Sequence, residues 1–170
     1  MRSFVSCTLG MVAAVQLAVA VPTAGAQASG PNACAFIDAA ELKKLTGRTD
    51  VLGTGPERSA PEALPKHMSQ CTYLNFTFAL TTNMNAEAFA KTRQNQTANT
   101  NRWKLQPISG LGDEAYYMWD GRPGSYRSVG VVFRKGTQQI ALGDLVSSEE
   151  VESLKQVLLT VAKAIAARMR

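Results

Sequence analysis

The feature that most constrains the fold is the alternation of side chains between Thr72 and Thr81. Large apolar residues occupy every second position of this segment: Leu74, Phe76, Phe78 and Leu80. A period of two places them on one face of a β-strand, as in an antiparallel sheet with one buried face. The segment therefore predicts a half-buried strand, and other elements must cover the apolar face of its sheet.

Three further strands are predicted to follow one another as a meander. Residues 115–119 and 127–134 are rich in aromatic and β-branched side chains, and the Gly- and Pro-containing stretch 120–125 separates them. A tight turn at Lys135-Gly136 then leads into a strand over 137–145. These strands extend the sheet without a crossover helix.

Two shorter strands and one long loop complete the strand predictions. A short strand is expected over 49–54, and an edge strand over 103–106, just before Pro107. Residues 55–69 contain three prolines, which cannot join a central ladder or continue a helix. We expect this segment to be a loop.

The first two helices are predicted from the residues that cap them. Asp38 and Glu41 form a capping box, in which each side chain can satisfy a free amide at the start of a helix over 39–46. Gly47 is placed to end that helix. Asn85 can cap a second helix that runs through Thr97.

The last helix has the clearest amphipathic pattern in the chain. Ser147 and Glu150 form a second capping box before it. Apolar residues then repeat at alternate spacings of three and four, as expected for one helix face: Val151, Leu154, Leu158, Val161 and Ile165. This helix is expected to lie along the sheet.

Together these elements predict a single α+β domain over residues 34–170. Its sheet should be mainly antiparallel, with five to seven strands and helices packed on its faces. The composition is 45% hydrophobic and 18% charged, which is ordinary for a globular chain and excludes collagen-like and wholly disordered classes.

Residues 1–26 have the features of a bacterial export signal. Arg2 precedes an apolar stretch, and Ala24-Gly25-Ala26 fits the small-x-small pattern that signal peptidase accepts. We expect cleavage after Ala26 and a flexible lead-in over 27–33. The apolar stretch is too short for a stable transmembrane anchor, and Cys7 precedes it, so Cys7 should leave with the signal. The mature protein is expected to be periplasmic or secreted.

Export gives the two remaining cysteines a defined chemistry. Outside the cytoplasm Cys34 and Cys71 meet an oxidising environment and can pair as a disulfide. The alternative is a metal site completed by His67, but structural zinc normally takes four ligands and more closely spaced cysteines. We therefore expect a disulfide, no metal and no cofactor.

The charge pattern argues against nucleic acid as a partner. The formal net charge is +5, from 18 basic and 13 acidic side chains. The basic residues are scattered, apart from the pairs Lys43-Lys44 and Arg134-Lys135, so no run of them follows a phosphate backbone.

The segment Gly110–Ala115 matches a short motif of dinucleotide-binding proteins. It fits G-x-G-x-x-A, but a dinucleotide site needs a helix after the glycines, and the residues that follow favour a strand. We expect a turn whose glycines adopt positive φ.

Asp113 and Glu114 could serve a hydrolase together with His67, the only histidine of the chain. Adjacent strand residues point to opposite faces, so no catalytic pair is predicted.

Aromatic side chains give the best indication of a binding surface. Five of them gather in one stretch of sequence and could line a pocket or stack on a ligand: Trp103, Tyr116, Tyr117, Trp119 and Tyr126.

Several short motifs together resemble a known family. Cys34 stands before a capped helix that ends in Leu45-Thr-Gly47, Ser69-Gln-Cys71-Thr-Tyr73 opens a strand, and Ile108–Ala115 precedes the meander and the last helix. Over residues 33–168 the chain resembles a group of exported bacterial domains of unknown function, often lipid-anchored in actinobacteria, with a PsbP-like α/β/α sandwich. The chain departs from the lipid-anchored members, since no cysteine follows its apolar signal. The resemblance implies a fold and an extracytoplasmic location, but no reaction.

The sequence thus favours a non-enzymatic binding or accessory module. Its partner would be an envelope protein or a small ligand, and its contact surface would be the aromatic meander or the Pro-rich loop. A small hydrolase that uses Asp113 or Glu114 with His67 is the alternative, and it requires these groups to meet around a cleft.

Overall fold

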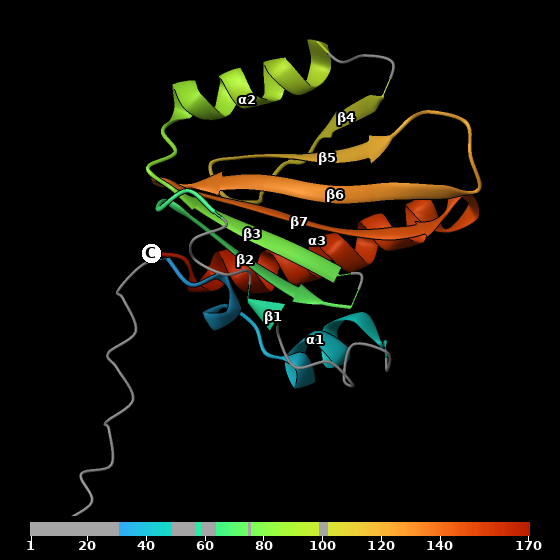
Figure 1. Ribbon diagram of the computed structural model, residues 1–170, viewed down its shortest axis with the longest axis horizontal. Helices are drawn as coiled ribbons and strands as arrows, with labels where there is room; N and C mark the ends of the chain where they lie inside the picture. The colour runs from blue at the N-terminus through green and yellow to red at the C-terminus, as the bar shows by residue number, and fades with distance from the viewer. Residues whose placement is uncertain (1–30, 49–56, 59–63, 75, 99–101) are drawn as a thin grey trace, which may run out of the picture.

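A computed structural model describes residues 31–48, 57–58, 64–74, 76–98 and 102–170. The predicted signal peptide and the strand expected over 49–54 lie outside these residues. The elements follow one another along the chain (Figure 1): η1 (Ala33–Ala35), α1 (Ala39–Thr46), β1 (Glu57–Arg58), β2 (Met68–Tyr73), β3 (Phe76–Thr82), α2 (Ala86–Ala98), β4 (Trp103–Pro107), β5 (Glu114–Asp120), β6 (Tyr126–Lys135), β7 (Gln138–Ser147), η4 (Ser148–Glu150) and α3 (Val151–Arg168).

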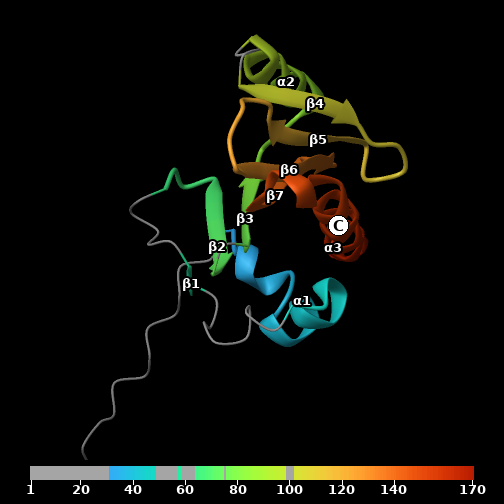
Figure 2. The ribbon, with the colours of Figure 1, turned by 90° about the vertical axis from the view of Figure 1, so that its right-hand side faces the viewer.

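The described strands form one seven-stranded sheet in the order β1-β2-β3-β7-β6-β5-β4. All neighbouring pairs are antiparallel. The sheet bends around α3, which lies on its inner face together with α1, whereas α2 lies on the outer face beside β4 and β5 (Figure 2). The predicted α+β class, with an antiparallel sheet and helices on its faces, is confirmed.

The main core lies between the inner sheet face and α3. The apolar stripe of the last helix faces the sheet as predicted, and Leu158, Val161 and Ile165 are fully buried. They pack against inward-facing strand residues that are equally buried: Phe78, Val131, Phe133, Ile140 and Leu142. Burial of this apolar area is the main source of stability for such a domain.

A second, smaller core lies under α2 on the outer face. Phe89, the one buried residue of α2, packs against Tyr116 with ring centroids 5.6 Å apart. Val132 completes the buried part of this cluster. Few apolar side chains therefore hold α2 to the sheet, in keeping with the polar composition of its second half.

The single strand predicted over 72–81 is wrong, because the chain turns within it. Tyr73 pairs with Phe76 across a tight hairpin, and both side chains are buried. Leu74 has a φ of 54° and is 48% exposed, so it belongs to the turn and not to the core. Residues 76–80 keep the predicted alternation in β3, whereas before the turn it is Tyr73 of β2, and not Leu74, that faces the core.

Two of the three predicted helix caps form. At α2 the Asn85 Oδ1 atom accepts a hydrogen bond from the Ala88 amide at 2.8 Å. At α1 the Asp38 carboxylate accepts a hydrogen bond from the Glu41 amide at 2.8 Å, and Gly47 ends the helix with a φ of 71°. At α3 the second capping box does not form. Ser147 Oγ instead donates to Glu150 Oε2 at 2.5 Å, and the 3₁₀ turn η4, which ends at Glu150, lies between Ser147 and the helix.

The disulfide expected from the sequence is present and fixes the N-terminal segment. Cys34 in η1 is bonded to Cys71 in β2, with Cα atoms 5.2 Å apart. Close by, the Ala33 amide donates to Ser69 Oγ at 3.0 Å, and the Tyr73 hydroxyl donates to the Ile37 carbonyl at 2.8 Å. Ala33 is fully buried and belongs to η1, so it is part of the folded domain.

Candidate functional site

The five aromatic residues that the sequence singles out do not form one surface. Tyr117 and Trp119 lie on the inner face against the main core. Tyr116 belongs to the outer cluster under α2. Trp103 is half-buried in the edge strand β4, with the Arg102 guanidinium carbon 4.6 Å from its ring centroid.

Tyr126 is the exposed member of the five. It lies at the start of β6, and 70% of its surface is accessible. Tyr126 pairs with Ser147 of β7, and Leu145 lies two residues before Ser147 on the same strand. The side chains of Tyr126 and Leu145 therefore lie on the same outer face, diagonally opposite each other. Leu145 is 53% exposed. We call these two residues the β6–β7 corner.

Asp113 and Glu114 are engaged in structural bonds. The Arg134 side chain, only 11% exposed, donates to Asp113 Oδ2 at 2.9 Å and to Glu114 Oε1 at 3.3 Å. Asp113 Oδ2 also accepts from the Gly136 amide at 2.9 Å. The two carboxylates therefore fasten the 110–113 turn to the end of β6.

His67 lies far from these carboxylates. It is exposed in the turn before β2, and its carbonyl accepts from the Thr82 amide at the end of β3. The strands β3, β7 and β6 separate β2 from β5, where Glu114 lies. At the usual strand spacing this corresponds to about 19 Å. The structure thus does not bring together the three groups of the hydrolase alternative.

The glycines of the 110–115 segment serve a turn, as predicted. Gly110 and Gly112 have φ values of 74° and 62°, and the strand β5 follows them. No helix starts there to receive a pyrophosphate. Within the described part of the chain, no three His, Cys, Asp or Glu side chains converge as a metal site would require.

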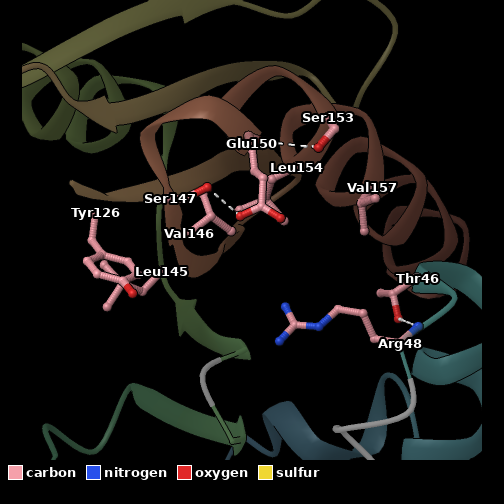
Figure 3. Close-up of a pocket in the computed structure, with 10 residues that line it drawn as sticks. All are labelled: Thr46, Arg48, Tyr126, Leu145, Val146, Ser147, Glu150, Ser153, Leu154 and Val157. Carbon is pink, nitrogen blue, oxygen red and sulfur yellow. Dashed lines mark hydrogen bonds between the residues drawn. The ribbon is translucent and has the colours of Figure 1, made fainter.

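A cavity of about 490 Å³ lies between the end of α1, the end of β7 and the start of α3 (Figure 3). Its walls are partly apolar and partly charged. The residues that line it come from distant parts of the chain: Thr46, Arg48, Tyr126, Leu145, Val146, Ser147, Glu150, Ser153, Leu154 and Val157. The β6–β7 corner forms one side of the opening.

Arg48 is held in this cavity by a buried carboxylate. The Asp144 side chain is fully buried on the inner sheet face, and it accepts a hydrogen bond from Arg48 Nη1. Its other oxygen accepts from the Leu145 amide at 2.7 Å. A buried carboxylate needs such partners, so the ion pair fixes Arg48 as a wall of the cavity.

Glu150 lies on the opposite side of the cavity from Arg48 (Figure 3). Its Oε2 atom contacts Ser147 Oγ, and its backbone carbonyl accepts from Ser153 Oγ at 3.0 Å. Glu150 is exposed, and it forms no ion pair with any residue that the structure describes.

A groove on the outer face adjoins the cavity at Leu145. It has a volume of about 350 Å³, and small residues form its floor. Gly130 and Gly143 pair across β6 and β7. A Cβ atom at Gly143 would lie 2.9 Å from the Val129 carbonyl oxygen, so no side chain fits there. The corner is therefore bordered by the cavity on one side and by this groove on the other.

Lys155 is a buried charge that the sequence analysis missed. Its Nζ atom lies 3.7 Å from the centroid of Trp119 and 2.8 Å from Glu152 Oε1, while only 4% of the side chain is exposed. The sequence does indicate this burial, because Lys155 follows Val151 by four residues and so falls on the apolar stripe of α3. The cation–π contact stabilises the ammonium away from water.

No protein-family model matches the chain. No curated protein matches it either. Among solved structures, the chain is similar to cyanobacterial PsbP (CyanoP) from Synechocystis sp. PCC 6803, at 10% identity and a TM-score of 0.32, over 66% of this chain and 94% of that one. A TM-score of 0.32 is too low to place the chain in that fold family, so membership of the exported-domain family stays a prediction.

No helix in the described ranges is both long and apolar enough to cross a bilayer. The longest, α3, carries its apolar residues on the face that packs against the sheet.

Tyr116 provides a pH-dependent test of the attachment of α2. Burial raises the pKa of Tyr116 to about 12, and its hydroxyl donates to Gln96 Oε1 at 2.7 Å. A folded-state pKa above the ordinary value of 10 contributes stability that is complete below pH 10 and is lost as pH rises toward 12. Tyr116→Phe should lower the free energy of unfolding by about 1 kcal/mol at neutral pH and make its decline above pH 10 shallower.

Urea unfolding at neutral pH and at roughly pH 11 measures both effects. Tyr126→Phe is the matched control, because it removes an exposed hydroxyl from the same outer face. If Tyr116→Phe and wild type lose the same free energy between the two pH values, Tyr116 does not hold α2 in this way.

Proposed function

We propose that this chain is a non-enzymatic binding or accessory module that works in the periplasm or after secretion. The observation that carries the proposal is the β6–β7 corner. Tyr126 and Leu145 expose large apolar surfaces side by side, next to a cavity and a groove. Exposed apolar residues that gather beside a hollow are typical of contact surfaces.

The ion pairs that the carboxylates form with arginines support a binding role over catalysis. Asp113 and Glu114 are bonded to Arg134, and Asp144 is bonded to Arg48. Hydrogen bonds from Arg122 lower the pKa of Asp120 to about 2, so this carboxylate stays ionised and engaged at neutral pH. A general acid or base needs a pKa near the working pH and a free approach to substrate.

The disulfide and the N-terminal sequence support an extracytoplasmic location. A bridge between Cys34 and Cys71 is stable where thiols are oxidised. The mass of the protein recovered from its own cells tests this location. We expect the polypeptide to begin at Gln27 and to gain two hydrogens on reduction, whereas a retained Met1 with two free thiols would contradict the proposal.

A titration with N-phenyl-1-naphthylamine, an uncharged aromatic dye, tests the contact surface. Amide NMR shifts should change at residues 126–128 and 145–150. The double variant Tyr126→Ser/Leu145→Ser should weaken dye binding by about tenfold or more, since both apolar walls are lost. Lys91→Ser, on the exposed surface of α2, is the control and should leave binding unchanged. Shift changes elsewhere, or an unaffected double variant, would contradict the assigned surface.

Assays with nitrophenyl esters and glycosides test the hydrolase alternative. The proposal expects wild type, His67→Ala and Asp113→Asn to match the rate in buffer. Turnover by wild type that disappears in a folded His67→Ala variant would overturn the non-enzymatic assignment.

A further inference from the structure

We infer that the cavity of Figure 3 takes a small ligand with an ammonium group on an apolar body. This inference rests on the proposed function, because it names the ligand class of the β6–β7 corner. The ligand class follows from which charges at the cavity are already matched, and from where the apolar wall lies relative to them.

The positive charge at the cavity is matched from within the protein. Arg48 donates to Asp144, whose side chain is fully buried. An anionic ligand that drew Arg48 away would leave a buried carboxylate without this partner, and the cost of an unpaired buried charge is high. Arg48 is therefore a fixed wall and a poor site for a carboxylate.

The negative charge of Glu150 is matched by no cation among the described residues. Ser147 contacts Oε2, and Oε1 accepts from no described donor. An ionised carboxylate offers about four acceptor positions on its two oxygens. An ammonium group supplies three donors and the opposite charge, so it complements Glu150 better than a hydroxyl or a carboxylate does.

The remainder of the wall suits an apolar body. Leu154 and Val157 come from α3, and Leu145 and Tyr126 come from the corner. A volume of about 490 Å³ lies within the range of small-molecule sites. A ligand with its ammonium at Glu150 can therefore place its apolar part against these side chains.

Three probes with the same chain and different head groups test the inference: hexylammonium, hexanol and hexanoate. Isothermal titration calorimetry should give the tightest binding for hexylammonium, by about tenfold over hexanol, with hexanoate weakest. The advantage of hexylammonium should shrink as salt is raised, since Glu150 is exposed.

Two neighbouring glutamates provide a matched pair of variants. Glu150→Gln should remove the advantage of hexylammonium over hexanol and leave hexanol binding unchanged. Glu149→Gln makes the same charge change one residue away, but Glu149 borders a different cavity, so it should keep the advantage. Equal losses in both variants would overturn the inference, because the attraction would then be a general field and not a site.

The other outcomes separate this inference from the proposed function. Preferred binding of hexanoate, or equal binding of all three probes at the corner, overturns the ammonium assignment but leaves a binding module in place. If none of the three binds, the assignment fails as well, and the dye titration then decides on the contact surface. Turnover dependent on His67 is the result that overturns the proposed function itself.

Discussion

Removal of the Cys34–Cys71 bridge is expected to lower the free energy of unfolding by about 4 kcal/mol. The bridge joins residues 37 positions apart, and a cross-link of this span restricts the unfolded chain strongly. Most small domains have a total stability of about 5–15 kcal/mol, so the loss is a large part of it. The variant Cys34→Ala/Cys71→Ala avoids a polar group at Cys71, which is fully buried.

Urea unfolding of the variant and of wild type, each with and without reductant, measures this effect. Reductant should destabilise wild type to the level of the variant and should leave the variant unchanged, which provides an internal control. A loss of less than about 1 kcal/mol would show that η1 and the bonds around Ala33 hold the N-terminal segment without the bridge.

Gly112→Ala is expected to have the second largest effect, a destabilisation of about 3 kcal/mol or more. Its φ of 62° is strained for any residue with a Cβ atom. In addition, that Cβ atom would lie 2.3 Å from the Arg134 carbonyl oxygen. The turn must therefore move away from β6, which weakens the bonds that Asp113 makes to Arg134 and Gly136.

Gly110→Ala is the matched control for this variant. Gly110 has a similar φ of 74°, but no atom lies within 4 Å of the place where its Cβ would be. It should cost about 1 kcal/mol from backbone strain alone. Thermal unfolding of the two variants compares the effects, and equal destabilisation would mean that contact with Arg134 is unimportant.

The sequence was sufficient for elements whose signal is local. The spacing of Leu154, Leu158 and Val161 predicted α3 and its buried face, and Asp38 predicted the start of α1. The segment around Leu74 failed for a physical reason. A two-residue hairpin turn can hold an apolar residue such as Leu74. The alternation of apolar residues in the sequence therefore runs from the turn into β3 and gives no sign that the chain reverses.

The candidate site was not predictable in the same way. Its cavity is built from α1, β6, β7 and α3, and no short stretch of sequence shows that Arg48 meets Asp144 across 96 positions. Aromatic residues close in sequence were expected to share a surface. They alternate along β5 instead, so Tyr116 and Tyr117 point to opposite faces.

The strand order has a consequence for how the chain matures as it emerges N-terminus first. Cys34 and Cys71 are both available early, whereas β3 must wait for β7, whose Gly143 pairs with Thr77. Until then the β2–β3 hairpin has one unprotected edge and a bare apolar side that carries Phe78. Early formation of the disulfide would hold η1 against this hairpin and cover part of it until β3 pairs with β7.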